Sequence, residues 1–372
     1  MSNNRPAEIG MHIQDVDTPA LLVDLDAMER NIDRMASFIK EKGIRHRVHA
    51  KTHKSADISL MQIAKGACGV CCQKVSEAEA MVRGGVRDVL VSNEIIGERK
   101  LQRLAALSKD ARIIVCADNA DNISDLNRVA GEFNTTLEVL VEIDVGAGRC
   151  GVKPGEEALE LAKKVAASGN LVFAGIQAYQ GKAQHIHSFE ERKGAIEAAC
   201  ALVRETVDLL QANGLECDIV GGAGTGTYQF ETASGVYNEL QCGSYVFMDV
   251  DYQKILMEDG REITDFENSL FIYTTIMSKT KIEKAVCDAG LKAQSVDSGL
   301  PAVYGRDDIS VLGVSDEHGV IADPDNLLKL GEKLKLIPGH CDPTVNVYDW
   351  YVGYRGERVE AVWPVQGRGM NL

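Results

Sequence analysis

Residues 20–50 read ALLVDLDAMERNIDRMASFIKEKGIRHRVHA, two apolar runs separated by a helical pattern. Four apolar residues of that pattern repeat at helical spacing: Met28, Ile32, Met35 and Ile39. The charged residues between them would face solvent, so the pattern predicts an amphipathic helix with one face on a core. Gly43 follows the pattern and is typical of a helix end. The stretch therefore predicts a strand, a helix and a second strand in succession.

The same alternation continues to about residue 250. The apolar runs cover residues 20–25, 45–50, 68–72, 88–93, 112–117, 137–143, 171–179, 217–222 and 239–247. Alternating strands and helices predict an α/β fold, either a closed (β/α)₈ TIM-type barrel or an open doubly wound sheet. Nine runs are one too many for the barrel, so we expect the first or the last to lie outside it.

The rhythm of the sequence changes after about residue 255. Short apolar runs follow one another there without a long amphipathic helix between them. This pattern is typical of an all-β domain. We therefore expect a barrel over residues 21–254 and a β-domain over residues 255–372.

Composition excludes several classes of function. The chain of 372 residues is 45% hydrophobic and carries a net charge of −15, which argues against a nucleic-acid or anionic-membrane surface. It contains no run of 18 apolar residues, and its N-terminus lacks the layout of a secretory signal, so we expect a cytoplasmic protein with reduced cysteines. Cys68 and Cys71 have zinc-knuckle spacing, but no second pair completes such a site.

The segment HAKTHK, residues 49–54, follows the second apolar run. If the strand continues, His49, Lys51 and His53 share one face at the mouth of a barrel. A lysine crowded by cationic groups has a lowered pKa and forms Schiff bases readily. Lys54 has the opposite parity and would face helices or solvent. The alternative is a solvated edge strand.

A glycine-rich loop, GGAGTGTYQF, spans residues 221–230 after another apolar run. Its glycines, with Thr225 and Thr227, can expose backbone N–H groups to a phosphate. A plain glycine turn is the alternative, because the loop lacks the lysine of a P-loop. A reactive lysine together with a phosphate cradle suggests pyridoxal phosphate.

A third motif, GHCDPT, spans residues 339–344. On a strand, His340 and Asp342 would point the same way and offer an imidazole and a carboxylate to a divalent cation. Two protein ligands leave positions open for water and substrate, as in a catalytic site. The alternative is a His and Asp paired in a turn before Pro343.

Together these motifs resemble the D-threonine aldolase and D-serine dehydratase family of fold type III pyridoxal phosphate enzymes. The resemblance rests on HAKTHK, GVCCQKVSEAEA, VEIDVGAGRCGV, GIQAYQG, GGAGTGT, YNELQCGSYVFMD and GHCDPT. It implies an alanine racemase-like barrel that carries the cofactor, with residues 1–20 joining the β-domain. Within the family, residues 290–308 and 346–353 are most similar to members that act on 3-hydroxy-D-aspartate.

The resemblance also implies roles for individual residues. The implied cofactor contacts are Lys51, Gln73, Arg149, Tyr179, Thr225, Gly243, Ser244 and Tyr252. Lys51 would bind the cofactor covalently, Tyr179 would face its pyridine nitrogen, and Arg149 its phenolic oxygen. His185 matches the general base. Ala223 departs from the commoner GGGTG loop but should still allow phosphate binding.

The implied reaction is retro-aldol cleavage of a 3-hydroxy-D-amino acid to glycine and an aldehyde. We expect 3-hydroxy-D-aspartate to give glyoxylate, with D-threonine, which would give acetaldehyde, as a further substrate. The alternative is a 3-hydroxy-D-aspartate or D-serine dehydratase, but family dehydratases carry Cys where this chain has Asp342. A cofactor-binding protein without enzyme activity would lack the β-domain.

The implied metal is Mn²⁺ or Mg²⁺, which suits a site of one carboxylate and one imidazole. Arg306 is the candidate partner for a substrate β-carboxylate, since a guanidinium binds a carboxylate through two hydrogen bonds. The alternative is that Asp307 and Asp308 hold Arg306 in a surface turn. We expect a homodimer.

Overall fold

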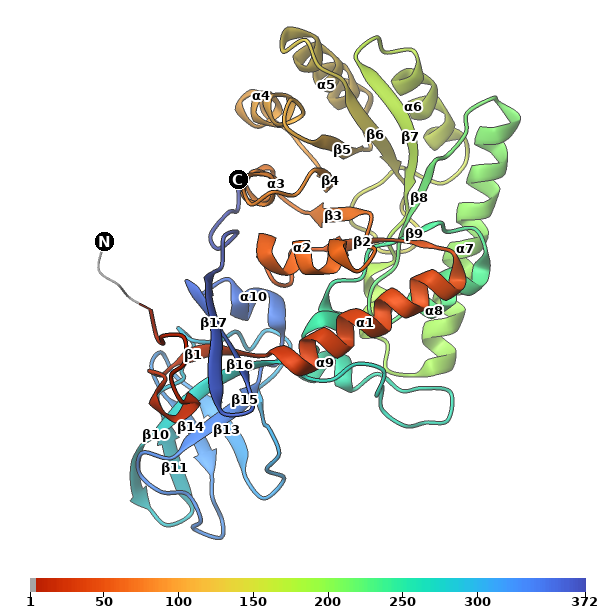
Figure 1. Cartoon of the computed structure of the whole chain (residues 1–372). Coiled ribbons are helices and arrows are strands. Elements are labelled where there is room, and N and C mark those ends of the chain that lie inside the picture. The colour runs from red at the N-terminus through yellow and green to blue at the C-terminus, as the bar shows by residue number, and fades with distance from the viewer. Residues whose placement is uncertain (1–4) are drawn as a thin grey trace.

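The computed structural model describes residues 5–372 as a closed barrel joined to a β-rich domain (Figure 1). Eight parallel strands form the barrel in sequence order: β2 (Arg45–His49), β3 (Gly69–Cys72), β4 (Asp88–Glu94), β5 (Arg112–Ala117), β6 (Leu137–Glu142), β7 (Leu171–Gln177), β8 (Ile219–Gly222) and β9 (Glu239–Leu240). Pairing of β9 with β2 closes the ring. The predicted (β/α)₈ barrel is confirmed.

Helices surround the barrel and follow its strands (Figure 1). They are α2 (Ala56–Ala64), α3 (Val75–Arg83), α4 (Glu98–Leu107), α5 (Ala120–Glu132), α6 (Glu156–Ala166), α7 (Phe189–Ala212), α8 (Tyr228–Ser234) and the short α9 (Val250–Gln253). Strand parity separates two apolar layers: Val89 and Val91 of β4 pack in the layer under the helices, while Leu90 packs inside the barrel. This packing leaves the ends of the strands to carry polar groups.

Helix α1 (Leu25–Lys42) ends at Gly43, as its sequence pattern predicted, and begins at Leu25, the last residue of the first apolar run. The Asp24 side chain caps its start by accepting a hydrogen bond of 3.0 Å from the Ala27 N–H. Gly43 ends it in the left-handed region at φ 64°. The four predicted apolar residues are all buried.

The first apolar run lies outside the barrel. It forms β1 (Ala20–Asp24), which pairs antiparallel with β10 (Leu270–Lys281) and parallel with β16 (Trp350–Arg355). The expected domain boundary at residue 21 therefore falls inside a strand of the β-rich domain. Sequence could not show this, because a run buried on both faces looks the same in either sheet.

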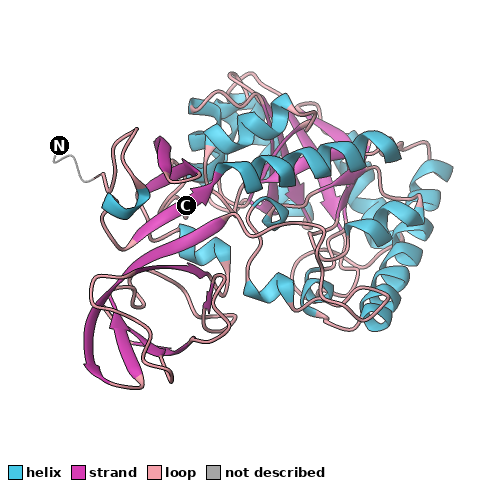
Figure 2. Cartoon of the chain, turned by 60° about the horizontal axis from the view of Figure 1, so that its bottom comes forward, coloured by secondary structure: helices cyan, strands magenta, loops and turns pink. Residues whose placement is uncertain are grey.

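The remaining strands complete the β-rich domain (Figure 2). They are β11 (Lys284–Cys287), β12 (Ala302–Val303), β13 (Ser310–Val314), β14 (Gly319–Ala322), β15 (Lys333–Ile337) and β17 (Arg358–Pro364), in the order β13-β14-β11-β10-β1-β16-β17, with β15 pairing with β10 and β12. Residues 10–13 lie along β17, where the Gly10 N–H donates to the Val359 carbonyl at 2.8 Å, and the 3₁₀ turn η1 spans Ile13–Asp15. Residues 1–4 lie outside the described part of the chain.

Two features of the described chain bear on the expected class of protein. Across residues 5–372, we find no helix with both the length and the apolar character needed to span a bilayer. Cys71 is buried and its thiol lies 3.0 Å from the Ser92 hydroxyl. Burial raises the pKa of this thiol to about 12, so it is protonated at neutral pH.

Candidate active site

A cavity of about 290 Å³ lies at the carboxyl ends of the barrel strands. Fifteen residues line it, and they include all eight of the implied cofactor contacts: Lys51, Gln73, Arg149, Tyr179, Thr225, Gly243, Ser244 and Tyr252. These residues come from the strand ends and loops all around the ring, so only a closed barrel brings them together. The position is where TIM-type barrels carry their active sites.

Lys51 reaches the cavity from a turn, not from a strand. Strand β2 ends at His49, and residues 50–53 turn toward α2, so the predicted shared face of His49, Lys51 and His53 does not form. His53 is fully buried, with its ring edge-on to Phe247 at a centroid distance of 6.5 Å. Lys54 points toward the helices, as expected, and pairs with Glu77 of α3.

The pKa of Lys51 is raised, whereas the sequence predicted a lowered pKa. Burial tends to lower its pKa, but the carboxylate of Asp342 outweighs burial and holds the pKa of Lys51 above its usual range. The histidines do not act as cations, because burial lowers the pKa of His53 to about 4 and that of His49 well below its usual value. The predicted lowering of the Lys51 pKa is therefore wrong for this state of the protein.

The segment GHCDPT forms a helical turn, not the predicted strand. His340 precedes the short helix α10 (Cys341–Val345), and Asp342 lies in its first turn. The buried carboxylate of Asp249 holds this turn on the barrel, because it accepts hydrogen bonds from the Cys341 N–H at 2.9 Å and the Tyr252 N–H at 3.0 Å. One acidic residue thus ties the metal-ligand candidates to a residue of the cavity wall.

His340 and Asp342 fit a divalent cation. The Oδ1 atom of Asp342 is buried and has no hydrogen-bond partner within residues 5–372. Burial opposes ionisation, but Lys51 and His340 lower the pKa of Asp342 to about 2. His340 Nδ1 lies 2.8 Å from the Asp297 carboxylate, a contact that orients the ring and leaves Nε2 available as a ligand. A hard divalent cation would satisfy both free atoms.

The glycine loop has the form of a phosphate cradle. A Cβ atom at Gly224 would lie 2.4 Å from the Gln184 Oε1 atom, and one at Gly243 would lie 2.6 Å from the His49 carbonyl oxygen. Gln184 holds the loop by accepting from the Gly226 N–H at 3.0 Å and donating to Thr227 at 2.8 Å. Side chains are excluded here, so the loop can approach a phosphate closely.

Arg149 and Tyr179 lie together on the cavity wall. The Arg149 guanidinium carbon is 6.0 Å from the centroid of the Tyr179 ring. Burial raises the pKa of Tyr179, so its phenol is neutral and able to donate a hydrogen bond. Gln73, the residue after β3, also forms part of the wall. Its amide nitrogen lies 3.0 Å from His49 Nε2 and 3.0 Å from the Ser92 hydroxyl.

A comparison with known proteins places the chain in a family. The alanine racemase N-terminal domain model matches residues 23–251, and the serine dehydratase domain model matches residues 269–354. The chain is 56% identical to the 3-hydroxy-D-aspartate aldolase of Paracoccus denitrificans strain Pd 1222, over 98% of this chain and 95% of that protein. It is 41% identical to the D-threonine aldolase of an Arthrobacter species, over 98% and 96% of the two chains.

The chain belongs to this family of aldolases. The crystal structure of the D-threonine aldolase of Filomicrobium marinum superposes with a TM-score of 0.95 at 46% identity, over 99% of this chain and all of that one. The resemblance deduced from the sequence motifs is therefore confirmed. Aldolases of this family are lyases that use pyridoxal phosphate, and the cavity of the present protein fits that cofactor.

Four predicted site residues lie outside the cavity lining: His340 and Asp342, described above, and His185 and Arg306. His185 sits on the 3₁₀ turn η2 (Gly181–His185) with its side chain 58% exposed, and its Nδ1 atom is 2.8 Å from Asp251. Arg306 lies in the β-rich domain, where its guanidinium binds Asp308 at 2.6 and 2.7 Å. The predicted carboxylate clamp at Arg306 is not supported within this chain, because Asp308 already occupies the two parallel donors.

Several polar residues of the site were not predicted from the sequence. They are Ser92, Gln177 and Gln241 in the lining, and Asp249, Asp251 and Asp297 behind it. Gln177 ends β7 and donates to Gln241 at 2.8 Å. A polar residue at the carboxyl end of a predicted barrel strand was a usable signal for Ser92 and Gln177. The aspartates gave no such signal, because their partners lie far away in sequence.

Proposed function

We propose that this aldolase relative uses pyridoxal phosphate and a divalent cation to cleave 3-hydroxy-D-amino acids to glycine and an aldehyde. The first candidate substrate is 3-hydroxy-D-aspartate, which would yield glyoxylate, and D-threonine is the second. The observation that supports this proposal most directly is the pairing of Lys51 with Asp342 at the cavity. It brings the cofactor-binding lysine and the metal-ligand carboxylate to the same place.

The residues of this chain would divide the chemistry among them. When bound, pyridoxal phosphate accepts the electron pair released by carbon–carbon cleavage, and the cation acidifies the substrate hydroxyl. Lys51 would bind the cofactor and be displaced by the substrate amine. Thr225 of the glycine loop and Ser244, which follows β9, would bind the phosphate. The neutral phenol of Tyr179 would face the ring nitrogen.

His185 would take the proton of the substrate hydroxyl. Its Nδ1 atom contacts Asp251, so Nε2 is the atom free to accept that proton. The Asp251 carboxylate raises the pKa of His185, which makes the imidazole a stronger base than an isolated one. His340 and Asp342 would hold the cation close to Lys51.

We also propose Mn²⁺ or Mg²⁺ as the metal, because a carboxylate and an imidazole are ligands that suit both ions. A homodimer in the cytoplasm is the proposed state of the protein. Two-fold dimers are the commonest assemblies of soluble proteins.

Products distinguish this proposal from the dehydratase alternative. We would incubate the purified protein with the isomers of 3-hydroxyaspartate, threonine and serine, and measure both sets of products. Glycine with an aldehyde from the D-isomers is the expected result. Ammonia with a keto acid as the main products would show a dehydratase instead.

A further inference from the structure

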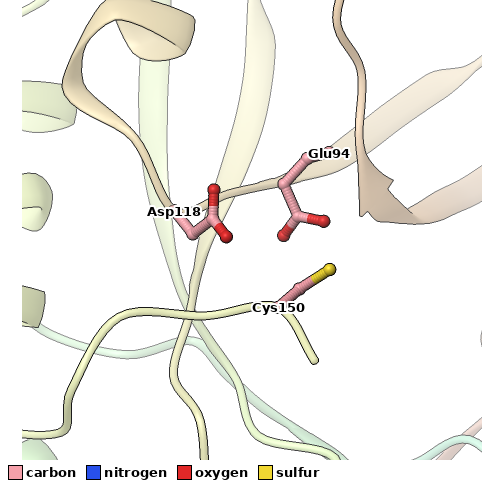
Figure 3. A group of neighbouring side chains, drawn as sticks. All are labelled: Glu94, Asp118 and Cys150. Carbon is pink, nitrogen blue, oxygen red and sulfur yellow. The ribbon is translucent and has the colours of Figure 1, made fainter. Parts of the chain in front are cut away.

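A second group of possible metal ligands lies at the mouth of the barrel. Glu94 ends β4, Asp118 follows β5, and Cys150 lies in the loop after β6. Their side chains point toward one another, and one ligand atom from each lies within 4.8 Å of the others (Figure 3). None of the three lines the cavity described above. The group is therefore separate from His340 and Asp342.

A buried carboxyl group lies beside this group. Glu142 ends β6, is only 6% exposed, and has the Glu94 carboxyl group and the Cys116 thiol as its polar neighbours. Burial and the adjacent carboxylate of Glu94 raise the pKa of Glu142 to about 8. The Oε1 atom of Glu94 is buried without a hydrogen-bond partner among residues 5–372. Two carboxyl groups thus meet here, and a shared proton or a bound cation would stabilise the pair.

The Arg149 guanidinium lowers the pKa of Glu142, but burial and the Glu94 carboxylate outweigh this effect, and the guanidinium lies on the cavity wall. Buried carboxylates that meet without a cation are costly unless they share a proton or bind a metal ion. The Gly151 N–H donates to Asp118 at 3.0 Å, which holds the loop with Cys150 against the carboxylates.

We propose that Glu94, Asp118 and Cys150 form a second cation site that binds Zn²⁺. Three protein ligands leave the fourth position of a tetrahedral Zn²⁺ for water, and a thiolate selects Zn²⁺ over Mg²⁺ or Mn²⁺. Tetrahedral ligands about 2.0–2.3 Å from one ion lie about 3.3–3.8 Å apart, so the clustered atoms, now within 4.8 Å of one another, would approach by up to about 1.5 Å on binding. Binding displaces the proton of Cys150, because burial and Glu94 raise the pKa of this thiol to about 11.

A cation bound in this site would stabilise the loop after β6, which carries Arg149 of the cavity wall. Arg149 precedes Cys150 directly, so a cation bound by Cys150 would fix the position of the Arg149 backbone. This role goes beyond the proposed reaction, which needs only the cation at His340 and Asp342. The two proposals can therefore fail independently.

Cadmium titration of the protein with its cofactor bound tests the site. We expect a cadmium–thiolate charge-transfer band in the ultraviolet that saturates at one equivalent of Cd²⁺. Added Zn²⁺ should displace the Cd²⁺ and remove the band. Cys150→Ser should abolish the band, and Glu94→Gln or Asp118→Asn should weaken Cd²⁺ binding at least tenfold. Cys68→Ser is the matched control, because Cys68 is also a half-buried thiol beside a carboxylate, 3.5 Å from Glu239. It should keep the band.

The double variant His340→Ala/Asp342→Asn separates this site from the proposed catalytic cation. It should keep the Cys150-dependent band, whatever happens to its activity. The proposal is overturned if the wild-type protein gives no band, or if the band survives Cys150→Ser. A band that disappears in Cys150→Ser but is unchanged by both carboxylate variants would mean adventitious thiol binding and would also overturn it. As a second measurement, Zn²⁺ should raise the Tm of the wild type but not that of Cys150→Ser.

Discussion

Lys51 and Lys54 lie in the same short turn after β2, yet they have different partners. Lys51 reaches the cavity and pairs with Asp342, whereas Lys54 is buried against α3 and pairs with Glu77. The backbone of Lys54 is in the left-handed region at φ 47°, which directs the chain away from the cavity before α2 begins. Of these two lysines, only Lys51 can therefore reach a cofactor bound in the cavity.

Replacing each lysine by alanine tests this difference. Lys51→Ala should lose the visible absorbance of the lysine-bound cofactor and all turnover. Lys54→Ala should keep both but reduce the free energy of unfolding by about 3–5 kcal/mol, because the buried Glu77 carboxylate loses its counter-ion. Absorption spectra and denaturant unfolding measure the two effects. Normal absorbance in Lys51→Ala would contradict the assignment of the cofactor lysine.

At the scale of elements, one contact joins η2 to α9. His185 on η2 lies 2.8 Å from Asp251 on α9, and the next residue of α9 is Tyr252, which lines the cavity. The contact therefore orients the proposed base relative to the cavity wall. It also sets the proton affinity of that base, since the Asp251 carboxylate raises the pKa of His185.

The pH profile of Asp251→Asn tests the proposed base. A general base works in its deprotonated form, so activity should rise with pH through the pKa of His185. The asparagine lacks the negative charge that raises this pKa, and the acidic limb of the profile should move to lower pH. NMR titration of His185 should show the same direction of change. An acidic limb that stays in place would mean that another group is the base.

The sequence predicted elements well and their junctions poorly. The helix at residues 25–42 and the strands of the barrel follow from periodicity, because that periodicity records which side chains are buried. Strand parity failed at Lys51, which lies in a turn after β2 has ended, and again at Asp342, which lies in the first turn of helix α10. Both residues still reach the site, and their motifs, not strand parity, were the signal that predicted them as site residues. The position of β1 and the partners Asp249 and Asp297 depend on tertiary contacts that no local pattern carries.

At the scale of the whole molecule, the two domains supply different parts of the site. The barrel provides all fifteen residues that line the cavity, whereas His340 and Asp342 come from the β-rich domain. The carboxylate of Asp249 connects the two by holding the Cys341 N–H on the barrel side. A bound cofactor and a bound cation would thus depend on separate sets of residues that meet at Lys51.

This separation predicts the effect of removing the metal. A chelator should abolish turnover but leave the cofactor absorbance intact, because the chelator removes an ion held by His340 and Asp342 and disturbs none of the barrel contacts. Added Mn²⁺ should restore activity in the wild type but not in Asp342→Ala, which lacks the carboxylate ligand. Cys341→Ser, one residue away with a buried thiol, is the neighbouring control and should respond like the wild type. Turnover that is indifferent to the chelator and to loss of the Asp342 carboxylate would show that the reaction proceeds without a metal, and the pairing of Asp342 with Lys51 would then be the feature that needs a catalytic explanation.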